Sequence, residues 1–373
     1  TNPDTRAFHE GLSDIVAYLL PFTYHDVVVG EVARVRSDLT IGTPLLNLAE
    51  QFGFARGSGK ALRSAAEKGE PTDYEQARSP HARGQVLAAA VMAGFLKAYG
   101  RASGATIRLA TAGRGLPDRG ELHPDLVNEV AKAATKSASR ILTMCIRALD
   151  YLPPVDVTMS DYLRAMVTAD TDLYPADTIG LRAGLIECFR ERGIYPTGVA
   201  SLAERSIRLE QVDERSLRND PLPVHPDFLL DLANEFDRRA ALRTMTIGDR
   251  YQDEEADEPF ETDDALRAGL WEAASPTIAS TQAAAYHSWA ERNRKALGLD
   301  DSTPIQVAGF HASQRTDDDG YNRTIVSVQF TQTARHDPEI EERLGGLAVK
   351  GGTTVIADSE GTVRYVIKKP LPG

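Results

Sequence analysis

The apolar residues of this chain change their spacing near Thr303, and this change constrains the fold more than any other feature. Over the first 205 residues they recur at the three- and four-residue spacing typical of amphipathic helices. After Thr303, β-branched residues alternate with polar ones in IQVAGFHASQ, RTIVSVQFTQ, TTVIADSEG and TVRYVIKK. The sequence therefore predicts a mainly helical α+β protein whose residues 303–370 form a small antiparallel sheet.

Prolines, glycines and capping residues predict where the helices begin and end. Pro21 ends the first helix, two prolines after Leu152 end a long one, and Gly193 closes a later one. Thr158 or Ser160 can cap the helix that starts with DYLRAMVTAD. We expect helices over 9–21, 25–38, 81–99, 124–150, 176–192, 225–243 and 265–297, and less regular ones around 44–68.

The pattern predicts three parts. These are a helical lobe over 1–205, a helical segment over 206–300 with a solvated acidic linker at 249–264, and an antiparallel β domain over 301–373. Within the last part, ADSEGT is a hairpin signal. DDDG at 317–320 resembles the core of a calcium loop but lacks its glutamate at the twelfth position, so we favour a hairpin turn.

Composition excludes several classes of function. The formal net charge is −12, which argues against nucleic-acid binding and anionic membrane surfaces. No run of about 18 apolar residues is present, so no membrane partner is expected. The two cysteines, Cys145 and Cys188, sit in apolar helical runs and are interpreted as buried hydrophobic residues. Such sparse cysteine usage indicates a reducing, cytoplasmic location.

The stretch HEGLSD begins with half of the zinc-protease signature HExxH. His9 and Glu10 match, but Ser13 stands where the second histidine is needed. Glu10 and Asp14 are four apart and share one helix face. Taken alone, they are read as carboxylates near a helix N-terminus that point to water.

A second block, SPHARGQVLAAAVMAGFL, places His81 at the start of a helix rich in small residues. Together the two blocks resemble the thermolysin-like zinc metallopeptidases, the gluzincins. There, a glutamate ligand follows the HExxH helix and a histidine opens a later helix; in this chain the glycine after that histidine comes one position early. CIRALDYLPPVDVTMSDYLRAMVTAD at 145–170 and ECFRERGIYP at 187–196 are similar to a poorly described bacterial branch of these proteins. The resemblance covers roughly residues 5–200.

The resemblance implies a role for each matching residue. Glu10 is the carboxylate ligand of a zinc ion, and Asp14, one turn on, orients a ligating imidazole. His81 stabilises the oxyanion of the tetrahedral intermediate. Glu75 or Asp73 is the expected carboxylate partner of His81. No catalytic role falls on His9, which is read as a surface residue at the helix start.

The chain departs from the family because it has no HExxH. Two histidine ligands of the zinc and the general base are then missing, so this polypeptide alone is not expected to hydrolyse peptides. Three explanations are expected: a fragment of a complete metallopeptidase, a product whose N-terminal half is present as another chain or disordered, or a degenerate relative used as a scaffold. We expect a C-terminal portion of a zinc metallopeptidase that acts on peptides or proteins, with its own N-terminal fragment as a further partner. The alternative is a non-catalytic protein-interaction scaffold.

Two weaker candidates remain. HPDLVNE, from His123 to Glu129, has ligand-type residues, but the proline after the histidine indicates a helix start. Asp170 and Asp172, in TADTDLYP, are placed just past a helix end. They can bind a cation or an arginine, although a polar loop is the favoured interpretation.

Overall fold

The computed structural model describes residues 2–37, 74–116, 121–212, 217, 220–229, 276–316, 320, 322–334 and 349–371. The chain divides into two compact units, Thr1–Leu209 and Glu210–Gly373. It is mainly helical with a four-stranded antiparallel sheet near the C-terminus, which confirms the predicted α+β class. The helices expected around 44–68, most of the one expected over 225–243, and the acidic run at 249–264 lie outside the described residues.

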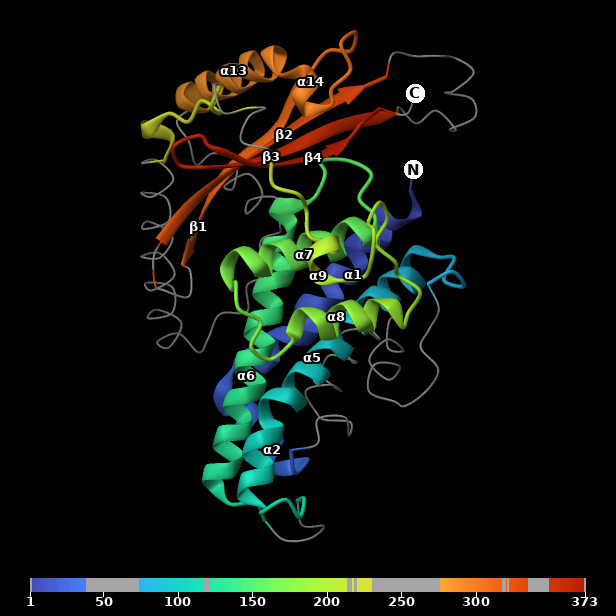
Figure 1. Ribbon diagram of the computed structural model, residues 1–373, viewed down its shortest axis with the longest axis vertical. Helices are drawn as coiled ribbons and strands as arrows, with labels where there is room; N and C mark the ends of the chain where they lie inside the picture. Colours follow the sequence, from blue (N-terminus) through green and yellow to red (C-terminus); the bar gives the residue numbers. More distant parts are fainter. Residues whose placement is uncertain are drawn as a thin grey trace, which may run out of the picture. The chain divides into compact units, whose positions relative to one another are not determined.

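The first unit is built from helices (Figure 1). Within the described residues they are α1 (Pro3–Leu19), η1 (Leu20–Thr23), α2 (His25–Arg34), α5 (Pro80–Ala110), α6 (Pro124–Arg147), η2 (Ala148–Tyr151), α7 (Met159–Leu173), α8 (Leu181–Arg190) and α9 (Glu204–Ile207).

Local capping explains where these helices begin. Asn2, Ser79 and His123 each accept a backbone N–H through their side chains, and each is followed by a proline at the first helical position. At α7, Thr158 and Asp161 form a reciprocal capping box. Of the two residues expected to cap this helix, Thr158 is therefore the cap.

Several helices differ from their predicted spans. The helix predicted over 9–21 begins earlier, at Pro3, and the one predicted over 25–38 ends earlier, at Arg34. The helix predicted over 81–99 continues to Ala110 in α5, because Gly100 lies in open space on its surface and does not interrupt it. The helix predicted from residue 176 begins only at Leu181 in α8. The Asp177 carboxylate accepts the N–H groups of Leu181 and Arg182, both at 2.9 Å, and so sets the start of α8.

Among the described elements, helix α5 packs most extensively against α1, α6 and α8. Its small residues let these helices come close. A Cβ atom at Gly94 would lie 2.7 Å from Leu185 Cδ1 of α8. The middle of α5, from Val86 to Phe95, therefore forms much of the core of the first unit.

Both cysteines are buried and free, as the sequence predicts. Cys145 on α6 is fully buried, and this burial raises the pKa of its thiol to about 12. Burial also raises the pKa of the Cys188 thiol. Both residues pack as small apolar side chains.

The second unit contains a sheet with strand order β1-β2-β3-β4, in which every neighbouring pair is antiparallel. The strands are β1 (Gln306–Thr316), β2 (Asn322–Thr333), β3 (Lys350–Asp358) and β4 (Val363–Lys369). The hairpin predicted at ADSEGT is present, whereas most of DDDG at 317–320 lies outside the described residues. Gly361, with φ of 83°, turns the chain between β3 and β4.

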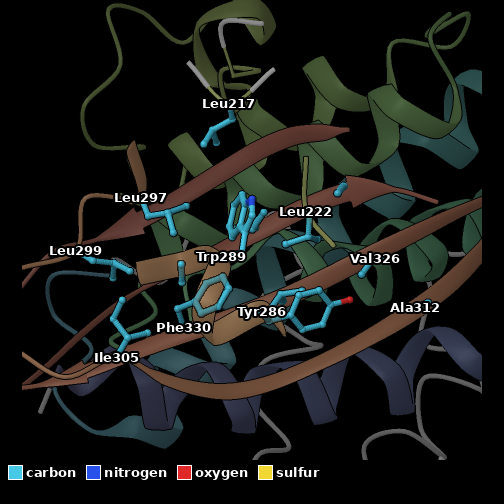
Figure 2. Close-up of a cluster of buried hydrophobic side chains, with 14 of the residues drawn as sticks. Leu217, Leu222, Tyr286, Trp289, Leu297, Leu299, Ile305, Ala312, Val326 and Phe330 are labelled. Carbon is cyan, nitrogen blue, oxygen red and sulfur yellow. The ribbon is translucent and has the colours of Figure 1, made fainter. Parts of the chain in front are cut away.

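Helix α13 (Pro276–Arg292) and the short α14 (Arg294–Leu297) contribute to the core of the second unit. Trp289 of α13 lies against Phe330 of β2, with ring centroids 6.2 Å apart (Figure 2). Tyr286 meets Phe310 of β1 edge-on, with ring centroids 5.3 Å apart. Leu222 belongs to the same cluster, which also includes buried residues of β2 and β3.

This shared core changes the predicted division. The first boundary lies close to the expected one, between Leu209 and Glu210. The described residues of 210–300 do not form a separate part, because they share one core with the strands. The physical reason is that one face of the sheet is apolar and α13 covers it.

Within the described residues, no single helix is long and apolar enough to cross a membrane. One bent pair, Pro3–Thr23 with His25–Arg34, has the length and composition of a membrane span, with an 85° bend between its parts.

Asp220 joins the segment before α13 to the end of that helix. Its carboxylate accepts hydrogen bonds from Arg292, at 3.1 and 3.2 Å, and from Asn293 at 2.8 Å. Its carbonyl accepts the Trp289 indole N–H at 2.8 Å. The pKa of the Asp220 carboxyl is lowered, chiefly by the hydrogen bond from Arg292.

We predict that Asp220→Asn lowers the free energy of unfolding by about 1 kcal/mol near neutral pH. A carboxylate whose folded-state pKa lies below its unfolded value of about 3.9 stabilises the fold above that value. The stabilisation is lost as the pH falls through the folded-state pKa, so variant and parent should converge in acid. Urea unfolding followed by tryptophan fluorescence over a pH series measures this. Glu360→Gln, in the exposed β3–β4 turn, is the control, and a pH-independent difference would contradict the prediction.

Candidate functional site

The closest approach of α1 and α5 occurs at two glycines. A Cβ atom at Gly11 would lie 2.8 Å from the Gly84 carbonyl oxygen. A Cβ at Gly84 would lie 2.9 Å from both the Ala7 carbonyl oxygen and the Gly11 nitrogen. These distances leave no room for a side chain, so the two backbones pack directly against each other.

This crossing brings Glu10 of α1 beside His81 at the start of α5. The Glu10 Oε2 atom is 3.5 Å from His81 Nδ1. Both side chains are open to solvent, with exposed fractions of 47% for Glu10 and 62% for His81. Two residues that the sequence singled out, 71 positions apart, are therefore neighbours on an accessible surface.

The other predicted residues fall around this pair. Asp14 lies one turn after Glu10 on α1 and is half-buried. The carboxylate that pairs with His81 is Glu10. Of the two partners expected from the sequence, Glu75 lies in the turn before α5, and Asp73 falls outside the described residues.

His9 and Ser13 behave as surface residues of α1. Both are exposed, and the Ser13 hydroxyl donates to the His9 carbonyl oxygen at 3.0 Å. Ser13 is thus a helix residue whose hydroxyl bonds the backbone of the preceding turn. It does not take the place of a zinc-binding histidine.

The part of the chain described by the structure contains no group of three or more His, Cys, Asp and Glu side chains that could hold a metal ion. Zinc in a hydrolytic site needs three protein ligands. The accessible Glu10 carboxylate fits one ligand position, and at least two further donors must come from elsewhere.

A buried carboxylate, Asp4, holds together the elements around this pair. Asp4 is only 4% exposed. It accepts a hydrogen bond from Arg83 of α5 at 2.5 Å, from the Tyr74 hydroxyl, and from the Met159 N–H at the start of α7 at 3.3 Å. Burial, followed by the hydrogen bond to Asp4, raises the pKa of Tyr74 above its ordinary value. Asp4 therefore joins the beginnings of three helices to the turn before α5.

Sequence reasoning did not find this network. Its members lie at positions 4, 74, 83 and 159, and no local pattern links them. Pro3 at the start of α1 gives the expectation of an acidic first turn, in which Asp4 would point to water. Only the packing of α5 and α7 against α1 buries it.

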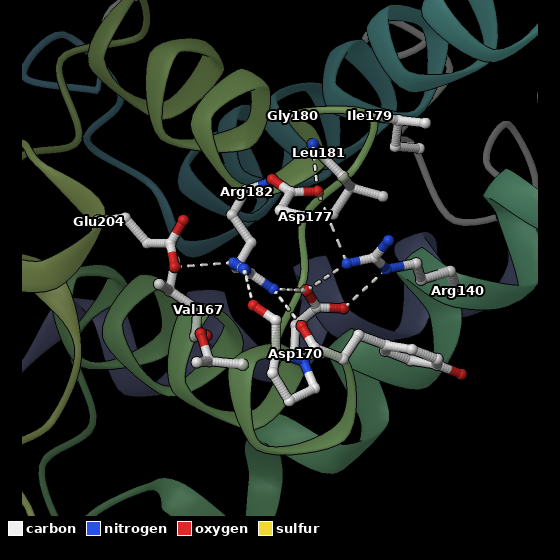
Figure 3. Close-up of polar contacts among 12 residues, drawn as sticks. Arg140, Val167, Asp170, Asp177, Ile179, Gly180, Leu181, Arg182 and Glu204 are labelled. Atoms are coloured by element: carbon white, nitrogen blue, oxygen red, sulfur yellow. Dashed lines mark hydrogen bonds and ion pairs between the residues drawn. The ribbon is translucent and has the colours of Figure 1, made fainter. Parts of the chain in front are cut away.

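A second buried carboxylate, Asp170, binds two arginines (Figure 3). Arg140 of α6 donates to both of its oxygens, at 3.0 and 2.8 Å, and Arg182 of α8 donates at 2.8 Å. Glu204 lies 3.0 Å from Arg182 Nε on its other side. Asp170 is 1% exposed and lies inside α7. The favoured interpretation of a polar loop is therefore wrong, and the arginine-binding alternative is correct.

No protein-family model, no curated protein and no solved structure matches this chain. The resemblance to gluzincins thus stays a prediction based on the blocks quoted above.

We predict that Gly84→Ala lowers the free energy of unfolding of the chain by about 1–3 kcal/mol, because its Cβ pushes α1 from α5. Gly100→Ala, in the same helix and in open space, is expected to stabilise the chain by up to about 1 kcal/mol. Urea unfolding followed by circular dichroism compares the two. Equal effects would show that the crossing is looser than the backbone distances indicate.

We also predict that Asp170→Asn destabilises the chain by about 3–5 kcal/mol, since it leaves buried guanidinium charges without their carboxylate. Glu187→Gln, which removes an exposed ion pair with Arg190, should have a much smaller effect because solvent screens that pair. The same unfolding measurement tests both. A small effect at Asp170 would mean that Glu204 and backbone carbonyl groups compensate the buried charges of the two arginines without it.

Proposed function

We propose that this chain contributes Glu10 as a zinc ligand, and His81 as an oxyanion-stabilising residue, to a zinc-dependent peptide hydrolase. The remaining ligands and the general base would come from a polypeptide segment that carries HExxH. The observation that carries the proposal is the juxtaposition of Glu10 and His81, 3.5 Å apart on an accessible face.

The chemistry assigns separate tasks to the two side chains. When bound, zinc would activate a water molecule as the nucleophile. The Glu10 carboxylate would provide one oxygen ligand, and Asp14, one turn on, would accept a hydrogen bond from the N–H of a ligating imidazole and orient the ring. The His81 ring, which opens α5, would donate an N–H to the oxygen that gains negative charge during attack on the peptide carbonyl.

The surroundings support this division of tasks. The Gly11–Gly84 crossing and the buried Asp4 network hold α1 and α5 in one register, which fixes the positions of Glu10 and His81. Both side chains are accessible, so ligands from another segment can reach them. Rigid elements that present exposed functional groups are what a hydrolytic site requires.

We predict that zinc content separates the roles of the two residues. In the protein expressed with the coding sequence that precedes Thr1, Glu10→Gln should weaken zinc binding by at least about ten-fold. His81→Gln should retain zinc and lower kcat for peptide hydrolysis by about 100-fold. Glu129→Gln, an equally exposed glutamate on α6, is the matched control. Atomic absorption and a peptide-cleavage assay give the two readouts, and unchanged zinc content in Glu10→Gln would remove it from the ligand set.

The alternative, a non-catalytic interaction scaffold, is favoured by one observation. The described residues alone bring no three metal-ligating side chains together. The coding sequence upstream of Thr1 distinguishes the two proposals. An in-frame HExxH within about 20–60 residues supports the hydrolase, because three ligands are needed. Its absence would favour the scaffold.

A further inference from the structure

An open groove lies where the end of α5 meets the beginning of α6. Its volume is about 600 Å³, within the range of about 300–1,000 Å³ that is typical of ligand pockets. Its described lining comes from Thr106–Leu116, at the end of α5, and from Glu121–Glu129, at the beginning of α6. The groove lies apart from Glu10 and His81, since it is formed by the opposite end of α5 from the one that carries His81.

The floor of the groove is apolar. Leu116, Leu122 and Leu126 are half-buried along it. Leu109, in the last turns of α5, has 83% of its surface exposed. A leucine this exposed, beside three others, forms an apolar surface that gains free energy when a partner covers it.

The rim of the groove is acidic. Glu121, Asp125 and Glu129 line it, and no lysine or arginine is among the described lining residues. His123 approaches Asp125 at 3.6 Å, and Glu129 binds Lys132 outside the lining at 2.7 Å. An apolar floor with an acidic rim complements a partner that carries apolar and basic side chains, and repels anionic lipid and nucleic acid.

We propose that this groove binds an amphipathic helix of another protein, one with an apolar stripe flanked by lysine or arginine. Asp125 and Glu129 are four residues apart on α6, so their carboxylates follow one another along a single helix face. Basic residues spaced by one turn on the partner would face them, while its apolar stripe covers Leu109 and the leucine floor. This proposal does not depend on the zinc site.

The test uses a fluorescein-labelled helical peptide of leucine and lysine, with leucine on one face, and a second peptide with glutamate in place of lysine. Fluorescence anisotropy with the full chain should show binding of the lysine peptide, weakened by salt, and little binding of the glutamate peptide. Leu109→Ser and Glu121→Lys should each weaken binding about ten-fold. Both residues are exposed, so the variants are expected to fold.

Matched controls are Ile146→Ser and Glu187→Lys, which remove an exposed apolar side chain and reverse an exposed charge elsewhere on the first unit. Equal losses in the controls and the groove variants would overturn the proposal, because binding would then follow only net charge. Equal affinity for the two peptides would also overturn it. So would sedimentation showing a dimer of the chain that Leu109→Ser dissociates, since a second copy would then be the occupant.

Discussion

The direct backbone contact between α1 and α5 at Gly11 and Gly84 is the constraint on which the first unit depends. A larger residue at either position would separate the helices and with them every group attached to the crossing. Because the contact lies one residue from Glu10 and three from His81, it sets the distance between these two side chains as well as the core. Fold and candidate site therefore share a single geometric requirement.

Two buried carboxylates, together with the glycine contact, fix how the helices of the first unit pack. Asp4 ties the start of α1 to Arg83 of α5 and to α7, and Asp170 ties α7 to Arg140 and Arg182. A buried charge is tolerated only when partners surround it, so each carboxylate selects one arrangement of the helices that meet there. Such networks hold the helices that meet there in one arrangement, which is what an exposed pair such as Glu10 and His81 needs from its support.

The surface around Glu10 and His81 and the groove around Leu109 differ in their chemistry. Around Glu10 and His81 the important groups are polar and accessible, and the proposed chemistry depends on donors from another segment. Around Leu109 the surface is apolar with an acidic rim, and it suits association with a basic amphipathic helix. One lobe thus presents a candidate chemical site at one end of α5 and a candidate docking groove at the other.

Much of the fold follows from the sequence alone, because helix periodicity, strand alternation, prolines and turn glycines act over a few residues. Pro80, Pro124 and Thr158 mark helix starts, and ADSEGT marks the β3–β4 turn, without reference to distant parts of the chain. The family resemblance selected Glu10 and His81. The tertiary structure alone decided that these two pair, that Asp4 and Asp170 are buried among arginines, and that α13 shares a core with the strands. Each of these depends on contacts between residues tens of positions apart, which only packing of the whole chain brings together.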